Sequence, residues 1–539
     1  DWVEPFRHRA VTTGPSSTVD LVLDCVAWLP RVEMIAFKVD IPGMPAAAWN
    51  RWYEHRGNPA WQERRTLSEE EGRAFEGEVL AATQLRGLLY HRGGHGWVDL
   101  ALRLKSIGGM DQEADLTEES RRLTAEVKGK RGLWRRRGVW TELCYSQPEA
   151  REQFIRPIVE YVQEHPGVDA LHVWLSDAGN NTCECPECRR LTHSDWYMML
   201  LNELAPRLRE INPNLRVVFL CYLNTLWPPE TVRPSPECDN LVFMFAPIDR
   251  CYQHRLGALD CGEPLPAERP AHNQVIQPWG NAIHVGLLEQ WRPFTTGDSF
   301  AFDYHFWLDW VIDHLVCDLT HVIPEDIEDL AKLGLGGMMC CGTQRCFYPT
   351  ALPMLRIALG LAGRETGEEQ EEEYFRLAYG TEGEAAKAFL DGLDQRRVRI
   401  EWGHERWDET HPRVWWDWTT LKHASATVAW LREELDKLEE AARSASNARE
   451  HQAWEILLHF HQFVLLAWRV AEAVHRGERE TAREVAEETV AYLLRTEPQV
   501  YRFTDTGLQL AEVRRWPHLA GADGKPLAGL LPMLGTQEE

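Results

Sequence analysis

Eight short apolar runs are spread over residues 1–350, and most of the stretches between them carry apolar residues at helical spacing. A short apolar run bounded by polar turns is typical of a buried strand. The runs predict strands at residues 9–12, 34–39, 87–91, 170–176, 216–222, 241–246, 299–305 and 336–341. Eight strands that alternate with helices predict an α/β fold, a (β/α)8 TIM-type barrel.

Two of the connecting segments show the helical pattern clearly. Residues 149–164 follow Ser146, which together with Glu149 has the spacing of a capping box, and Pro157 predicts a kink. Residues 196–211 repeat leucine four positions apart on one face. A doubly wound open sheet is the alternative architecture, but no glycine-rich phosphate loop follows the first strand.

After residue 350 only the helical pattern continues. We therefore predict two domains, the barrel at residues 1–350 and an all-helical C-terminal domain at residues 351–539. The helices are expected at residues 351–362, 368–379, 384–393, 421–442, 453–474 and 482–494.

Two segments interrupt this order. Residues 106–140 are polar and basic, and we interpret them as an insertion in the third βα unit that forms either a solvated surface or a lid. Residues 402–418 are rich in tryptophan and separate two groups of helices. They predict either a packed seam between domains or a rim that binds sugars.

The net charge and the lengths of the apolar runs restrict which classes of partner the chain can bind. With 58 Lys and Arg against 83 Asp and Glu, the formal charge is −25. Such a surface repels a phosphate backbone, so we expect no nucleic acid partner. No apolar run reaches the ~20 residues of a membrane span, so we expect no membrane partner either. An oligomer remains possible.

Tryptophan and cysteine are both numerous. The 24 Trp are unusually many; most are expected to fill the core, but indole rings also form the platforms on which sugars stack. The 13 Cys form an odd and scattered set, unlike a secreted disulfide framework. We therefore expect a reducing, cytoplasmic compartment, with secretion as the alternative.

Residues 170–190 predict one wall of an active site. A buried strand ends there at Ser176 and Asp177. Barrels of this type place catalytic groups at the carboxyl ends of their strands. Three cysteines follow at once with the spacing Cys-x-Cys-x-x-Cys, and a tight thiol cluster at this point would fix the loop that carries Asp177.

The cysteine cluster predicts a structural Zn²⁺ site, because thiolates at this spacing are typical of a metal knuckle. Its ligands would be Cys183, Cys185 and Cys188, with Cys251 as the expected fourth and His193 or His254 as alternatives. A disulfide plus one free thiol and a set of unliganded thiols are the other interpretations. We expect no organic cofactor.

Polar and aromatic residues at the other strand ends should face the same pocket. They suit a neutral substrate rich in hydroxyl groups, a carbohydrate. Glycoside hydrolysis uses two carboxyl groups, or one with a substrate amide, and Asp177 and Asp303 are the best-placed pair. The residues expected to bind substrate are His95, Trp97, Asn180, Tyr222, Trp227, Asp249, Tyr252, Trp279, His305, Trp307 and Arg345.

A series of short motifs runs through the barrel. They are Gly94-His95, Leu143-Cys144-Tyr145-Ser146-Gln147-Pro148-Glu149, Ser176-Asp177, Cys183-Glu184-Cys185-Pro186-Glu187-Cys188, Tyr222-Leu223, Pro228-Pro229, Ala246-Pro247-Ile248-Asp249-Arg250-Cys251-Tyr252 and Phe302-Asp303-Tyr304. In this order they resemble glycoside hydrolase family 163, which grew out of a domain-of-unknown-function group (number 4838). The resemblance covers about residues 5–360.

The resemblance implies a barrel hydrolase for β-linked N-acetylglucosamine in glycans, retaining configuration through the acetamido group of the substrate. One carboxylate would orient the acetamido nitrogen, and another group would protonate the leaving oxygen. Related hexosaminidases carry an Asp-Glu pair after strand four, whereas this chain has Asp177-Ala178. Another residue must then be the acid, with Asp303 preferred over Asp249 and Glu142.

We therefore expect a glycosidase of the β-N-acetylglucosaminidase type. The missing Glu motivates one alternative, a barrel that binds carbohydrate without hydrolysing it. A glycosidase for a sugar without an acetamido group and a zinc-dependent hydrolase are the others.

Overall fold

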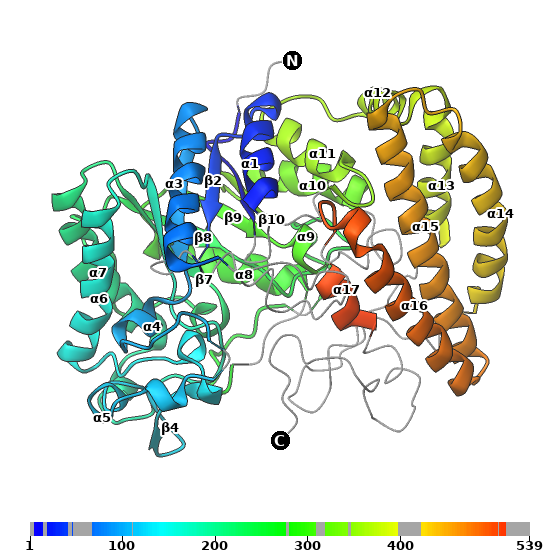
Figure 1. Ribbon diagram of the computed structural model, residues 1–539. Helices are drawn as coiled ribbons and strands as arrows, with labels where there is room; N and C mark the ends of the chain where they lie inside the picture. Colours follow the sequence, from blue (N-terminus) through cyan, green and yellow to red (C-terminus); the bar gives the residue numbers. More distant parts are fainter. Residues whose placement is uncertain are drawn as a thin grey trace.

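Eight parallel strands close into a barrel in the computed structural model (Figure 1). The structure describes residues 5–13, 19–40, 46, 67–109, 111–262, 264–275, 280–308, 319–342, 347–396, 422–504 and 506–513. The strands are β1 (His8–Thr13), β2 (Ala36–Val39), β3 (Leu89–Gly94), β6 (Ala170–Val173), β7 (Arg216–Cys221), β8 (Leu241–Phe245), β9 (Ser299–Asp303) and β10 (Gly337–Gly342). Around the barrel they follow the order β1-β10-β9-β8-β7-β6-β3-β2, which confirms the predicted (β/α)8 architecture.

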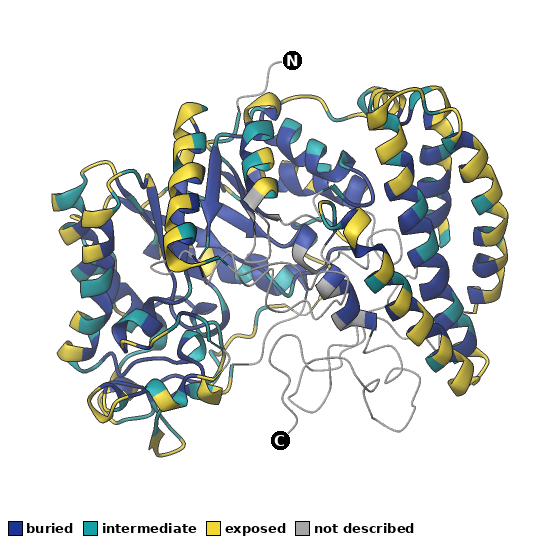
Figure 2. Cartoon of the chain, in the orientation of Figure 1, coloured by how far each residue is buried: buried dark blue, intermediate teal, exposed yellow. Residues whose placement is uncertain are grey.

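Helices cover the outside of the barrel between its strands. They are α1 (Val19–Trp28), α3 (Glu69–Leu85), α4 (Trp97–Ala101), α6 (Pro148–Glu164), α7 (His193–Ile211), α8 (Asn281–Trp291), α9 (His305–Leu308) and α10 (Leu319–Lys332). Helix α7 begins with a capping box in which Thr192 and Asp195 bond each other's backbone N–H groups. The strands and the inner helix faces are buried (Figure 2).

The capping box predicted for α6 is wrong. Gln147 is the N-cap of α6, and Pro148 fills the first turn without needing a hydrogen-bond partner. The Ser146 hydroxyl lies instead against the cysteine cluster, 3.1 Å from Cys188 Sγ. Glu149 pairs with Arg122 at 2.6 Å. Both side chains are therefore drawn away from the helix end by tertiary contacts.

The insertion at residues 106–140 is a packed substructure. It contains α5 (Glu118–Arg121) and a hairpin of β4 (Glu126–Val127) and β5 (Lys130–Arg131). Leu116, Leu123 and Leu133 bury their side chains in the core of the barrel part. The basic residues are engaged as well, since Arg136 pairs with Asp111 at 2.9 Å.

The C-terminal part is helical, as predicted. Its helices are α11 (Leu352–Leu361), α12 (Glu368–Tyr379), α13 (Gly383–Arg396), α14 (Ala424–Ala442), α15 (Ala448–His475), α16 (Arg479–Val500) and α17 (Thr506–Val513). Helix α15 runs between α14 and α16 and is the most buried of the three (Figure 2). The tryptophan-rich residues 402–418 lie outside the described residues. Among the described helices, none is long and apolar enough to cross a membrane.

Candidate active site

Asp177 presents an exposed carboxylate just beyond the end of β6. Its side chain is 41% exposed, and its backbone N–H donates to the Val139 carbonyl of the insertion at 2.9 Å. The Tyr222 hydroxyl, at the end of β7, donates to Asp177 Oδ1 at 3.1 Å. His95 Nε2, just after β3, lies 3.7 Å from the same oxygen. Three neighbouring strands thus orient one accessible carboxylate, as predicted for the carboxyl edge of a barrel.

The tautomer of His95 follows from its second contact. Its Nδ1 lies 2.8 Å from the Leu175 carbonyl oxygen. Because a carbonyl oxygen only accepts, Nδ1 carries a hydrogen and Nε2 faces Asp177. The ring also meets Trp174 edge to face, with centroids 4.9 Å apart. This packing fixes the imidazole beside the carboxylate.

A second partly exposed carboxylate, Asp40, lies on the β2 side of the same edge, with 22% of its side chain exposed. Asp40 pairs with Lys38, whose ammonium nitrogen lies 4.5 Å from the centre of the Trp174 ring. Burial lowers the pKa of Lys38 well below its ordinary value. Gly94 keeps this corner open, because a Cβ there would lie 3.3 Å from Trp174 and 3.4 Å from Asp40 Oδ1.

Tyrosines form the opposite side of this edge. Tyr304, after β9, is buried, and its pKa is raised well above the ordinary value by burial and by the charges of Tyr222 and Asp177, among others. Tyr252 belongs to the same buried cluster inside the barrel. Tyr222, His95 and the Trp174 ring that packs on His95 thus place aromatic and hydroxyl groups beside Asp177, a combination that suits a sugar.

Asp303 is placed differently from the expectation. Its side chain is 1% exposed and accepts a hydrogen bond from Arg250 Nε at 3.1 Å. His305 contacts it as well, and Asp326 completes this fully buried ion network. Burial alone would raise the pKa of Asp303, but Arg250 and His305 hold it below the ordinary range. A general acid needs a raised pKa, so this geometry argues against that role.

Glu142 is also enclosed. It accepts from Ser176 Oγ at 2.7 Å and from the Tyr145 hydroxyl at 3.0 Å, and His193 Nε2 lies 3.2 Å away. Burial would raise its pKa, but His193 and these hydrogen bonds keep it below the ordinary value. Glu142 therefore ties the strand end that carries Asp177 to the start of α7, and it is no better suited as the acid.

Several residues expected to bind substrate have structural contacts instead. Trp97 is fully buried, and its indole N–H donates to the His172 carbonyl at 2.9 Å. Trp227 is 8% exposed and belongs to the outer core. The Asn180 side chain accepts a hydrogen bond from the Val275 N–H and donates one to the Val275 carbonyl. The pattern of alternating strands and helices does not reveal whether a residue near a strand end points into the pocket or into the core.

The remaining predicted residues divide into three groups. Asp249 is half-buried after β8, and Tyr252 and His305 are buried beside Arg250. Trp307 lies in α9, where the structure describes its backbone alone. Trp279 and Arg345 lie outside the described residues.

The cysteine cluster has a different fourth member from the one expected. Cys144 lies with Cys183, Cys185 and Cys188, and their four sulfur atoms are all within 4.8 Å of one another. Cys251 lies in a separate group with His254 and Cys261. Residues 124 and 143 form a β-bridge that brings Cys144 to the β4 hairpin. The Glu184 N–H donates to the Glu126 carbonyl of that hairpin at 2.7 Å, which brings the loop after β6 to the same place. Cys144 belongs to the motif Leu143–Glu149, but nothing in the sequence indicates that it lies beside the other three cysteines.

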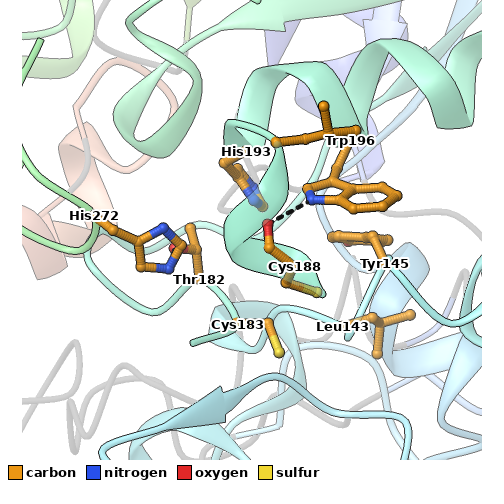
Figure 3. A pocket seen from close by; sticks show the side chains of 9 residues that line it. Leu143, Tyr145, Thr182, Cys183, Cys188, His193, Trp196 and His272 are labelled. Carbon is orange, nitrogen blue, oxygen red and sulfur yellow. Dashed lines mark hydrogen bonds between the residues drawn. The ribbon is translucent and has the colours of Figure 1, made fainter. Parts of the chain in front are cut away.

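A pocket next to the cluster is lined by residues of the same loop and of α7, together with Leu143, Tyr145 and His272 (Figure 3). Its polar groups are already occupied: Trp196 donates to the Cys188 carbonyl at 2.9 Å, and Thr182 Oγ1 bonds His272 at 3.0 Å. Asp177 is not among its lining residues. We therefore take the Asp177 edge, and not this pocket, as the candidate active site.

Comparison with known proteins supports the fold and part of the resemblance. A domain of unknown function, DUF4838, matches residues 124–281. The sequence has no match among curated proteins. The assignment to glycoside hydrolase family 163 stays a prediction.

Solved structures of glycoside hydrolases share the architecture. A family GH115 4-O-methyl-alpha-glucuronidase with specificity for decorated arabinogalactans is 11% identical, with a TM-score of 0.55 over 100% of this chain and 64% of that one. A GH89 enzyme from Clostridium perfringens, in complex with GlcNAc-alpha-1,4-galactose, is 11% identical, with a TM-score of 0.50 over 92% and 54%. This chain thus spans less than two thirds of either enzyme. At such identities the likeness concerns the fold.

Proposed function

We propose that this chain is a glycoside hydrolase that cleaves a β-linked sugar, with N-acetylglucosamine-containing glycans as the substrate class. The observation that carries the proposal is the exposed Asp177 carboxylate, oriented by Tyr222 and His95 beside aromatic side chains. A carbohydrate-sized, hydroxyl-rich ligand fits such a lining. The barrel supports the proposal, since the solved structures with this fold include glycoside hydrolases.

The proposed reaction retains configuration with help from the substrate. The acetamido oxygen attacks the anomeric carbon while an acid protonates the departing oxygen, and water then opens the cyclic intermediate. Asp177 would accept the acetamido N–H and stabilise the charge that develops on it. Both Tyr222 and His95 approach Oδ1, so within the described residues Oδ2 is left for the substrate. Asp249 and Asp40 are the remaining candidates for the acid.

The test is hydrolysis of aryl glycosides, α and β, with and without a 2-acetamido group, by the wild type and by Asp177→Asn. We expect cleavage of β-acetamido substrates alone and a loss of turnover of about 10³-fold or more in the variant, with unchanged thermal unfolding. Cleavage of other sugars would discard the acetamido mechanism. Full activity of Asp177→Asn would refute the role of Asp177.

A second candidate is a barrel that binds carbohydrate without hydrolysing it. The observation that favours it is the burial of both Asp303 and Glu142 in ion pairs, which leaves the acid unassigned. This candidate predicts binding on a glycan array, weakened in Tyr222→Phe, with no turnover of intact glycans.

A further inference from the structure

We propose that Cys144, Cys183, Cys185 and Cys188 form a tetrathiolate site for a structural Zn²⁺. The Cys144 sulfur lies 3.7 Å from the sulfurs of both Cys185 and Cys188. Four thiolates at a Zn–S distance of about 2.3 Å in a tetrahedron are separated by about 3.8 Å, so these two distances match, and all four sulfurs lie within 4.8 Å of one another. A disulfide needs about 2.05 Å, and the described cysteines are all free thiols.

The surroundings of the four sulfurs suit thiolates. The backbone N–H of Glu126 points at Cys183 Sγ at 3.3 Å, and that of Cys188 points at Cys185 Sγ at 3.4 Å. Arg131 Nη2 lies 3.8 Å from Cys144 Sγ. Hydrogen-bond donors and a cation around metal-bound sulfur offset the negative charge that four thiolates leave on a divalent ion.

The ligand set points to zinc in a structural role. Soft thiolates select Zn²⁺ or iron rather than Mg²⁺ or Ca²⁺. Four protein ligands close the coordination sphere, whereas catalytic zinc keeps one position for water. The site would therefore take no direct part in the reaction, which separates this proposal from a zinc-dependent hydrolase.

The position of the site explains what the metal would stabilise. Three chain segments meet there: the β4 hairpin, the segment before α6 and the loop after β6. The Glu184 backbone N–H donates to the Glu126 carbonyl at 2.7 Å, next to the cluster. The same loop begins at Asp177, so the metal would fix the base of the loop that carries the candidate catalytic carboxylate.

Metal analysis of the full chain, purified without chelator, tests the proposal. We expect about one Zn²⁺ per chain, lost in Cys144→Ser and retained in Cys251→Ser, which is the matched control. Titration of the thiols with a mercurial should release the zinc as four thiols react. Metal retained in Cys144→Ser but lost in Cys251→Ser would overturn the assignment of the fourth ligand.

Two measurements on the wild type keep the test decisive if Cys144→Ser does not fold. Cobalt exchanged into the site should give the strong visible absorption and thiolate charge-transfer bands of tetrahedral sulfur coordination. Alkylation and mass spectrometry should find all four cysteines as thiols once the metal is removed. Iron in place of zinc, a disulfide within the cluster, or no metal uptake on addition of Zn²⁺ would each overturn the proposal, whatever the activity of the protein.

Discussion

Asp177 and Asp303 illustrate how neighbours decide the chemistry of a strand-end carboxylate. Both follow barrel strands, and the sequence gives them equal standing as catalytic candidates. Asp177 is 41% exposed and meets a phenol and an imidazole, whereas Asp303 is 1% exposed and lies against the guanidinium of Arg250. The first arrangement leaves a carboxylate for a ligand, and the second uses it to neutralise a buried cation.

Substitution of Asp303 should therefore affect stability first. Asp303→Asn removes one of two carboxylates that face Arg250 and leaves that buried cation poorly compensated. We expect the free energy of unfolding to fall by about 3–5 kcal/mol in urea denaturation. Asp177→Asn, the matched control at an exposed position, should change it by less than about 0.5 kcal/mol. Equal stability of the two variants would contradict this assignment.

The protonation of His305 makes the stability of the same ion network depend on pH. Burial and the charge of Arg250 lower its pKa, but Asp303 and Asp326 outweigh these effects and raise the pKa to about 9. Because the unfolded value is about 6.5, charged His305 stabilises the fold fully below about pH 6.5, and this contribution is lost as the pH rises through about 9. The difference is roughly 3 kcal/mol.

The measurement is urea unfolding of the wild type and of His305→Gln from pH 6 to 10. The stability difference between them should shrink across that window. His451→Gln, at an exposed position in α15, should show no such trend. A constant difference between the wild type and His305→Gln would mean that His305 is not charged in the folded state.

At the scale of elements, strands and helices are well predicted because periodicity records which faces are buried. All eight barrel strands, the two barrel helices predicted at residues 149–164 and 196–211, and the helices between residues 351 and 500 appear where the apolar pattern places them. The site was less predictable. Side-chain direction and pairing across the fold depend on tertiary contacts, so Trp97 points into the core and Cys144, not Cys251, meets the other three cysteines.

Asn180 shows how one side chain couples two loops near the site. Its Oδ1 accepts from the Val275 N–H at 2.8 Å, and its Nδ2 donates to the Val275 carbonyl at 3.0 Å. Its backbone N–H donates to Asn224 Oδ1 at 2.8 Å. Its φ of 56° lies in the left-handed region, which Asn tolerates and Ala does not. Residues 264–275 are thus held against the loop after β6.

Asn180→Ala should loosen the Val275 end of residues 264–275, because His272 and Asn273 still bond Thr182. We expect faster amide hydrogen exchange there and a stability loss of about 1–3 kcal/mol, from the lost hydrogen bonds and the strained backbone. Asn180→Gly removes the bonds without the strain, so it should accelerate exchange at a smaller cost in stability. Asn214→Ala, at an exposed turn, is the control. Unchanged exchange in Asn180→Gly would show that the side chain does not hold the segment.

At the scale of the whole molecule, contacts cross the predicted boundary at residue 350. The Phe6 N–H, just before β1, donates to the Leu361 carbonyl at the end of α11 at 2.9 Å. Arg364 pairs with Glu33 at 2.8 Å. The Tyr348 hydroxyl bonds His459 of α15 at 2.9 Å. The two parts also share one continuous hydrophobic core, so the barrel is completed by the helices that follow it.

We therefore expect residues 1–350 expressed alone to lack a cooperative unfolding transition, whereas the full chain should unfold in a single one. Truncation at residue 350 exposes the apolar side chains that α11 covers, including those of α10, and leaves the Phe6 N–H without its helical partner. Calorimetry and near-UV circular dichroism of both chains make the comparison. Tyr348→Phe in the full chain should lower stability by about 1 kcal/mol, because it removes one buried hydrogen bond and leaves the His459 Nδ1 unpaired. A sharp transition in the fragment would instead establish the barrel as an independent domain, because its own strands and helices would then suffice to close the core.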